Sequence, residues 1–427
     1  MYSLIGALTL FLILVTFHEY GHYSVARYFK IKIIKFSIGF GPDLYKWKNK
    51  DNIRFSLSAI PFGGYVAFHD PADTKNYNKL NTEEKKYVLA NRPAIERSLV
   101  VLAGPIYNFI LAFFVFTLVG LFIPKQSDMV SAQVVAIDNQ KFYEVVAVNN
   151  KEINSVQALE VALLDLTGYT GDVNIELFDY TDQNQVYLQE DVINLKFQEG
   201  QAPSQFFGII PFADFKPRIE NVETESTAEQ VGFISGDTIT RINQERISSM
   251  YQATIALNKF GQQIDVEIER DGRALNIALP SKQEGTSYGL RFGPEANSLS
   301  SSIVFGYNQT VFWIKNTFKF LFKTLNGTMG IENLSGPVGI AKVAGDSLVS
   351  GLIPFLLLLG ILSISLGAFN LLPLPMLDGG QFLFILVEKL KGSPISLKLK
   401  ATLMNLSFLL ILTLFIFVMV NDIARII

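Results

Sequence analysis

The stretch VTFHEYGHYS, residues 15–24, places two histidines and a glutamate at the end of an almost wholly apolar run that begins at Ser3. Ionisable side chains inside a membrane-spanning segment are costly, and they usually mark a functional site. His18, Glu19 and His22 form the pattern H-E-x-x-H. On a helix, residues four apart share a face, so both imidazoles can bind one zinc ion while the glutamate acts as general base.

The histidine content of the chain strengthens this interpretation. There are three histidines, two fall in the motif, and His69 stands alone, so we assign it no role. The alternative is two core histidines satisfied by backbone groups. It would require a chance pairing around a glutamate inside an apolar helix. The motif therefore predicts one Zn²⁺ ion bound by His18 and His22, with Glu19 as the catalytic base.

The composition favours a membrane protein. Of 427 residues, 49% are hydrophobic and only 18% are charged, which is too apolar for an ordinary soluble enzyme. Four segments, approximately 3–25, 99–122, 352–372 and 401–420, reach the roughly 20 residues that a spanning helix requires. The first has no basic start and no small-residue cleavage site, so we interpret it as a retained helix. The lack of cysteine excludes disulfides and thiolate metal ligands.

The charge distribution predicts how the chain is oriented in the membrane. Residues 25–99 hold 14 Lys and Arg against 7 Asp and Glu, and residues 388–400 hold 4 Lys against 1 Glu. Residues 125–350 hold 17 basic against 28 acidic residues. Because cytoplasmic loops carry an excess of Lys and Arg, we expect the first two regions in the cytoplasm and the third on the opposite side. Nothing in the sequence predicts nucleic-acid binding.

The segment 46–70, between the first two apolar runs, has the pattern of a β-hairpin. Apolar and polar residues alternate around Phe55, a turn signal stands at residues 61–64, and a second short run follows. This hairpin either dips into the bilayer or lies on its surface. An edge along residues 53–68 could pair with an unwound substrate, which makes Phe55 and Gly64 candidate substrate contacts.

Asp378 is the candidate for a third metal ligand. Hydrolytic zinc takes three protein ligands and one water, and only another spanning segment can reach the same depth. Asp378 follows the third apolar run in NLLPLPMLDGGQ, residues 370–381. A buried carboxylate needs a partner, and a metal would be sufficient. Pro373 and Pro375 are expected to stop the helix, with a sharp turn at residues 379–380. The alternative is that Asp378 caps the next helix.

Short β-type runs and turns fill residues 127–282. Residues 229–249 combine a Gly-Asp turn with alternating isoleucines, and residues 264–279 are typical of a hairpin closed at Asp271–Gly272. A fainter copy of the same strand–turn–helix order occurs at residues 142–163. The region therefore predicts two related units in tandem.

These motifs together resemble the site-2 protease family of intramembrane zinc metalloproteases, and within it the bacterial RseP-type regulators of the sigma-E response. Further matching stretches run almost from end to end: GFGP (39–42), PFGGYV (61–66), AGPIYNF (103–109), SGPVGIA (335–341) and NLLPLPMLDGG (370–380). The resemblance implies that His18, His22 and Asp378 are zinc ligands and that Glu19 is the base. It also implies that Asn370, with the loop of Pro373 and Pro375, binds substrate backbone.

The resemblance further implies a biological setting. The substrates would be single-pass membrane proteins of the anti-sigma-factor type, or remnant signal peptides, cut after an upstream site-1-type protease has trimmed them. The chain would lie in the bilayer of a bacterial inner membrane, with the active site towards the cytoplasm and two PDZ domains in the periplasm. Those PDZ domains would either capture a free carboxyl terminus or act as a gate against untrimmed substrates.

We therefore expect a mainly α membrane protein with about four transmembrane helices, a membrane-associated β-hairpin and a tandem PDZ insertion of α+β type. The expected parts are residues 1–126, 127–204 (first PDZ, degenerate), 205–284 (second PDZ), 285–350 and 351–427. Within 285–350, residues 302–325 are predicted to form an amphipathic helix on the membrane surface, or one packed on the β-rich domains. A membrane scaffold and a metal transporter remain the alternative functions.

Overall fold

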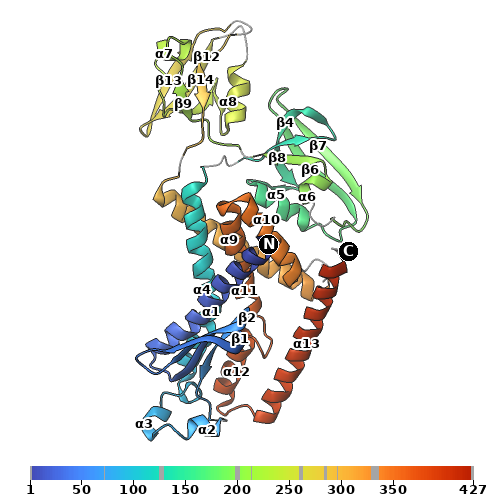
Figure 1. Cartoon of the computed structure of the whole chain (residues 1–427). Helices are drawn as coiled ribbons and strands as arrows, with labels where there is room; N and C mark the ends of the chain where they lie inside the picture. Colours follow the sequence, from blue (N-terminus) through green and yellow to red (C-terminus); the bar gives the residue numbers. More distant parts are fainter. Residues whose placement is uncertain are drawn as a thin grey trace. The chain divides into compact units, whose positions relative to one another are not determined.

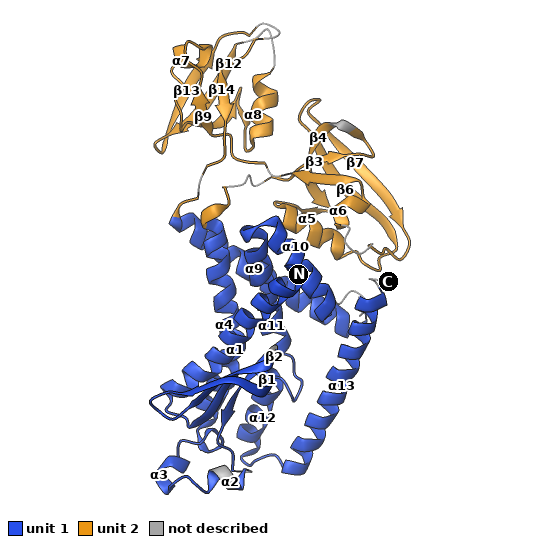
Figure 2. Cartoon of the chain, in the orientation of Figure 1, with its two compact units in different colours: residues 1–120, 299–427 blue, residues 121–298 orange. Residues whose placement is uncertain are grey.

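The computed structural model of the chain divides into two compact units. Unit 1 comprises residues 1–120 and 299–427, and unit 2 comprises residues 121–298 (Figure 2). The structure describes residues 2–71, 73–124, 129–197, 202–212, 214–258, 263–282, 286–295, 297–327 and 336–424. The predicted boundaries at 126/127 and 284/285, and Ser335 of the SGPVGIA motif, lie outside these described residues.

Unit 1 contains, in the described part of the chain, four helices long and apolar enough to cross a membrane. They are α1 (Tyr2–Tyr28), α4 (Ala94–Phe122), α11 (Leu352–Asn370) and α13 (Leu397–Ala424). Each contains or nearly contains one of the predicted segments, so the prediction of four spanning helices is confirmed. Figure 1 shows these helices among the remaining elements of the chain.

Three of the spanning helices share one core. The buried side chains that α1, α4 and α11 contribute are Leu10, Leu14, Leu111, Val115, Phe355 and Leu359, and Ala344 of a further helix joins them. The backbones of α1 and α4 approach closely at Gly21, where an added Cβ would lie 2.5 Å from the Ala103 carbonyl oxygen. A side chain larger than hydrogen would force the helices apart, so Gly21 sets the spacing at the end of α1 that carries the histidines.

Two further helices pack on this bundle. In α9 (Leu299–Leu325), Gly306 lies so close to α4 that an added Cβ would be 3.0 Å from the Phe113 carbonyl oxygen. Trp313 packs beside Phe116. Helix α9 therefore packs against the spanning helices themselves, which neither of the two predicted placements included. In α10 (Pro337–Ser350), Ala344 contacts α1 at Gly6.

A buried carboxylate joins the last helix to α10. Asp422 of α13 is 2% exposed. Its carboxylate accepts hydrogen bonds from the backbone N–H groups of Gly336, Val338 and Gly339 at 3.0, 3.1 and 2.8 Å. The first N–H groups of a helix have no partner within the helix, and a carboxylate both accepts their hydrogen bonds and complements the helix dipole. Asp422 thus anchors an otherwise mostly exposed helix to the element that packs on α1.

The strands β1 (Ile33–Lys48) and β2 (Arg54–Phe68) form an antiparallel sheet whose pairing differs from the prediction. Residues 33–38 pair with 64–68 on one side and with 54–57 on the other, and residues 54–58 also pair with 43–48. The predicted pairing of the runs before and after the Pro61–Gly64 signal is therefore wrong. Each strand bends back on itself, and β1 does so at Gly39 and Gly41, which have positive φ. Across the sheet, the order of the segments is therefore 64–68, 33–38, 54–58 and 43–48.

One ion pair stabilises the bend of this sheet. The Lys35 ammonium lies 2.6 Å from the Asp43 carboxylate, and its hydrogen bond holds the pKa of Asp43 below the usual range. The Ser37 hydroxyl contacts those of Ser56 and Ser58 at 2.9 and 3.0 Å. The shorter elements that follow in unit 1 are α2 (Thr74–Tyr77), α3 (Thr82–Lys85), the 3₁₀ turn η1 (Leu89–Asn91) and α12 (Asp378–Lys391).

The first half of unit 2 is built on one antiparallel sheet in the order β7-β6-β4-β3-β8, with β5 paired to β4. The elements are β3 (Ser131–Val134), β4 (Asp138–Val148), β5 (Lys151–Glu152), α5 (Val156–Leu164), β6 (Gly171–Asp179), β7 (Asn184–Val192), α6 (Pro203–Phe206) and β8 (Ile209–Phe212). Strand β8 pairs with β3, so this half extends past the predicted boundary at residue 204.

The second half of unit 2 has two small sheets, β11-β10-β12-β13 and β14-β9. The elements are β9 (Ile219–Val222), α7 (Thr227–Gln230), β10 (Thr238–Ile242), β11 (Glu245–Arg246), α8 (Met250–Leu257), β12 (Ile264–Arg270), β13 (Arg273–Leu279) and β14 (Leu290–Phe292). The predicted hairpin is confirmed, because Arg270 pairs with Arg273 across Asp271 and Gly272, both at positive φ. Strand β14 follows the predicted end at residue 284.

Candidate metal centre

The two motif histidines lie one helical turn apart on the inner face of α1. His18 is 8% exposed, and the Nε2 atoms of His18 and His22 are 3.3 Å apart. Their rings meet edge to face, with centroids 4.9 Å apart. The i, i+4 spacing of the sequence therefore produces the expected shared face, turned towards the other helices of the bundle.

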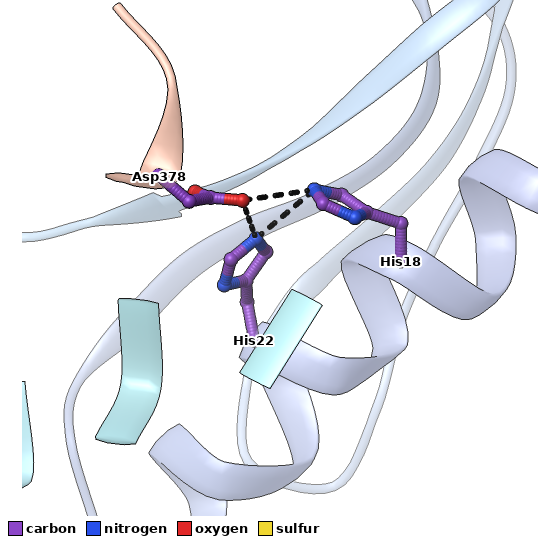
Figure 3. A group of neighbouring side chains, drawn as sticks. All are labelled: His18, His22 and Asp378. Carbon is purple, nitrogen blue, oxygen red and sulfur yellow. Dashed lines mark hydrogen bonds and ion pairs between the residues drawn. The ribbon is translucent and has the colours of Figure 1, made fainter. Parts of the chain in front are cut away.

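Asp378 meets this pair from the far end of the chain. Its Oδ2 atom lies 3.3 Å from His18 Nε2 and 3.5 Å from His22 Nε2, and Figure 3 shows the three side chains pointing at one spot. Asp378 is the first residue of α12, and the cap position before it is Leu377. The carboxylate therefore points at the histidines and does not cap its helix. A cluster of these three residues is what the sequence predicted.

The loop between α11 and α12 brings Asp378 to this position. Helix α11 ends at Asn370, as the following prolines predict, and the chain then folds back over the first turn of α12. An added Cβ at Gly379 would lie 2.2 Å from the Leu371 carbonyl oxygen, and one at Gly380 would lie 2.1 Å from that of Leu374. The expected sharp turn at the two glycines is wrong: both are helical, and they allow the loop to cross α12 closely.

The donor set fits a zinc ion. One ligand atom from each of His18, His22 and Asp378 lies within 4.8 Å of the other two. Donors at the corners of a tetrahedron around zinc, with bonds of roughly 2.0–2.2 Å, are separated by roughly 3.3–3.6 Å. The three observed separations are 3.3, 3.3 and 3.5 Å. Asp378 Oδ2 is buried without a hydrogen-bond partner. A cation bound between this oxygen and the two imidazole nitrogens would stabilise the buried carboxylate.

Glu19 lies between this cluster and the edge of the β1–β2 sheet. Its side chain is buried, at 8% exposure, although it carries a carboxylate. An added Cβ at Gly64 would be 2.9 Å from Glu19 Cγ, and the Val66 backbone amide interacts with the carboxylate. The sheet segment 64–68 is an edge of the sheet. A buried carboxylate therefore lies between the three clustered side chains and an open strand edge.

The other predicted substrate residues have different surroundings. Asn370 ends α11 and is half-buried, Pro373 is exposed in the loop, and Pro375 accepts a hydrogen bond from Gln381 at its carbonyl oxygen. Gly64 lies on the edge beside Glu19. Phe55 belongs to an inner segment of the sheet, where its ring stacks on that of Trp47 with centroids 5.3 Å apart. Of the two sheet residues, Gly64 is the one beside the cluster.

The remaining histidine lies outside the cluster. His69 follows β2 and, with Arg97, Gln381 and Lys400 among other residues, lines a separate cavity of about 270 Å³. No role was predicted for His69, and its position gives it none in the metal centre.

Sequence reasoning missed three residues of α4 that contact the histidines. Val100 accepts a hydrogen bond from His22, an added Cβ at Gly104 would touch both rings, and the Asn108 amide lies beside His18. For Gly104 and Asn108 the signal was present in the AGPIYNF stretch at residues 103–109, which matched the resembling family but was given no chemical role.

Comparison with known proteins agrees with this geometry. The model of peptidase family M50 matches residues 6–414, which is nearly the whole chain and includes the three clustered side chains. The chain belongs to peptidase family M50. It is 30% identical over 437 residues to the regulator of sigma E protease of Haemophilus influenzae, covering 97% of this chain and 96% of the relative.

Two further relatives have the same coverage of both chains, 97% of this one and 96% of the relative. The regulator of sigma-E protease RseP of Escherichia coli (strain K12) is 29% identical over 439 residues. A putative zinc metalloprotease of Vibrio cholerae is 30% identical over 445 residues. This M50 protein is therefore a multi-pass membrane enzyme of the zinc metalloprotease class, and the alternatives of a scaffold or a transporter are set aside.

Proposed function

We propose that this M50 enzyme hydrolyses peptide bonds inside the transmembrane segments of single-pass membrane proteins. The observation that carries the proposal is the convergence of His18, His22 and Asp378 beside Glu19 within a bundle of spanning helices. Substrates of the anti-sigma-factor type are inferred from the resemblance to regulators of sigma-E proteases, with remnant signal peptides as a second class. An upstream site-1-type protease would make the first cut.

In this proposal the three clustered side chains bind one zinc ion. Zinc bound there would polarise a substrate carbonyl and acidify a water molecule. The Glu19 carboxylate takes a proton from the water as the water oxygen bonds to the carbonyl carbon of the substrate. The same carboxyl then delivers the proton to the amide nitrogen as the C–N bond breaks. Glu19 is next to His18 in sequence and buried beside it, which holds its carboxylate within the site.

Substrate binding is proposed to use the edge segment 64–68. A transmembrane helix must unwind before its peptide bonds are accessible, and an unwound strand in lipid needs new backbone partners. The edge segment can supply them by strand addition, and Gly64 allows the closest approach to Glu19. Asn370, at the end of α11, is proposed to bind a further substrate backbone group, with Pro373 and Pro375 keeping its loop rigid.

Proline substitution at the edge tests this binding mode. Phe68→Pro removes an amide that faces the open edge, because the neighbouring His69 N–H points inward to the Lys32 carbonyl oxygen. Loss of one backbone hydrogen bond of about 1–1.5 kcal/mol should slow cleavage about tenfold. The matched control is Tyr45→Pro in the opposite edge segment, residues 43–48, where the side chain is 65% exposed. Initial rates on a reconstituted membrane substrate provide the measurement. Equal rates for the two variants, with zinc content unchanged, would rule out strand addition at this edge.

Metal removal tests the proposed function as a whole. The purified protein is mixed in proteoliposomes with a single-pass substrate whose outer domain is already trimmed. We expect chelation to abolish cleavage and added zinc to restore it, with the cut mapped by mass spectrometry inside the transmembrane segment. The proposal would be contradicted if cleavage continued in a sample shown by metal analysis to contain no zinc. It would also be contradicted if every cut lay outside the transmembrane segment.

The proposed topology follows the charge distribution. We infer that the basic segment of residues 25–99 faces the cytoplasm of a bacterial cell, that the active site lies towards that side of the inner membrane, and that unit 2 lies in the periplasm. The two β-rich halves of unit 2 are proposed to be a tandem PDZ pair. Their role as a gate against untrimmed substrates is favoured by the resemblance, and capture of a free carboxyl terminus is the alternative.

A further inference from the structure

Helix α4 presents three residues to the histidine pair at intervals of four. Val100, Gly104 and Asn108 share one face of α4, just as His18 and His22 share one face of α1. Val100 contacts His22 and Asn108 contacts His18, so the two helices pass each other in opposite directions at this point. Each imidazole therefore has its own partner on α4, on the side of the ring away from Asp378.

The partner of His22 decides which ring nitrogen carries the proton. His22 Nδ1 lies 2.8 Å from the Val100 carbonyl oxygen. A carbonyl oxygen can only accept a hydrogen bond, so Nδ1 must be the protonated nitrogen. The lone pair of a neutral His22 is then on Nε2, which is the atom directed at Asp378.

Asn108 stands in the equivalent position for His18. Its side-chain nitrogen Nδ2 lies 3.2 Å from His18 Nδ1, and both residues are buried. In this orientation Nδ2 donates to Nδ1, so the proton of a neutral His18 sits on Nε2, points into the cluster and excludes a metal. Oδ1 of the same amide is buried without a hydrogen-bond partner, and a 180° rotation of the amide brings Oδ1 to Nδ1. A site that binds metal therefore requires Oδ1 to face Nδ1.

Helix α4 is closely packed around Asn108. The Ser363 hydroxyl of α11 donates to the Asn108 backbone carbonyl at 2.8 Å, and both residues are fully buried. Gly104 leaves the space that the rings occupy, because an added Cβ would lie 2.4 Å from His22 Nε2 and 2.8 Å from His18 Cε1. The approach of α4 to the histidines is thus close and fixed.

We propose that Asn108 is a positioning residue of the metal centre. Its Oδ1 atom accepts the Nδ1 proton of His18 and so fixes the tautomer whose Nε2 can bind zinc. This inference rests on the proposed zinc site. Hydrogen-bond partners of metal-ligating histidines commonly contribute 10–100-fold to metal affinity, and α4 supplies one such partner to each histidine.

Two substitutions at Asn108 and one at Ser363 test the proposal in the full-length protein in detergent. Asn108→Leu keeps the size but removes the acceptor, whereas Asn108→Asp keeps an acceptor oxygen. Ser363→Ala removes the hydrogen bond to the Asn108 backbone and leaves the amide in place. The measurements are the rate of zinc loss to excess chelator and the visible absorption spectrum of the cobalt-substituted protein.

We expect Asn108→Leu to lose zinc roughly 10–100-fold faster than the wild type and to have an altered cobalt spectrum. Asn108→Asp and Ser363→Ala should stay within about threefold of the wild-type rate. Wild-type zinc retention and spectrum in Asn108→Leu would overturn the proposal, as would equal impairment of the Leu and Asp variants, which indicates a packing role. A wild-type protein that binds neither zinc nor cobalt would instead overturn the proposed metal site itself.

Discussion

Substitution of Glu19 by Gln is expected to abolish measurable cleavage while the protein keeps its zinc. Glutamine has nearly the same shape as glutamate but cannot take a proton from water at neutral pH, so the rate should fall roughly 10²–10⁴-fold. Glu19 does not belong to the set of three clustered ligand atoms, so metal content should remain near one ion per chain. Single-turnover cleavage of a trimmed membrane substrate and metal analysis of the same sample provide the two measurements.

The matched control for this variant is Glu83→Gln. Glu83 is an exposed carboxylate of the same unit, in α3, and it pairs with Lys86 at the surface. Its loss should leave the cleavage rate within about twofold of the wild-type rate, because exposed ion pairs contribute little to stability. A Glu19→Gln protein that cleaves at the wild-type rate with zinc bound would refute the assignment of Glu19 as base. One that has lost its zinc would show that Glu19 supports the metal centre.

The second large effect is expected from Asp378→Asn. The change removes the negative charge that faces the two imidazoles at 3.3 and 3.5 Å while keeping the side-chain volume. Loss of a partner that merely orients a ligand costs roughly 10–100-fold in metal affinity, and loss of a direct ligand should cost more. We therefore expect the purified variant to carry little zinc and to be inactive until zinc is supplied in large excess.

Asp346→Asn provides the comparison for this prediction. Asp346 is an exposed aspartate of α10, in the same unit and outside the cluster. It should keep both zinc content and activity at the wild-type level. Zinc titration of both variants, followed by competition with a chromophoric chelator, measures the difference in affinity. An Asp378→Asn protein with wild-type zinc affinity would remove Asp378 from the ligand set and leave two histidines without a third protein donor.

Local pattern was enough to predict the parts of the chain whose structure depends on residues close together in sequence. Four apolar segments became four long helices, and the i, i+4 spacing of His18 and His22 put both rings on one face. The hairpin closed at Asp271–Gly272 formed as predicted, because a two-residue turn with positive φ dictates its own register. In each case the interactions that decide the structure lie within a few residues.

The pairing within the β1–β2 sheet shows where local pattern fails. Residues 54–58 and 64–68 alternate as a hairpin would, yet they do not pair with each other, because both pair with residues 33–38, on opposite sides. An alternating pattern indicates that a strand has one apolar and one polar face, but it does not determine which strand lies beside it. The bends at Gly39 and Gly41 allow residues 33–38 to take the place between them. Phe55 therefore lies inside the sheet, and Gly64 lies on its edge.

The sequence by itself determined the membrane class, the helical face that bears His18, Glu19 and His22, and Asp378 as the candidate third ligand. Only the tertiary structure decided that Asp378 reaches that face and that Asn108 stands behind His18. The physical reason is that periodicity is a property of one helix, whereas these contacts depend on how closely separate backbones approach. That approach is set by small residues such as Gly21, whose importance is visible once the neighbouring helix is in place.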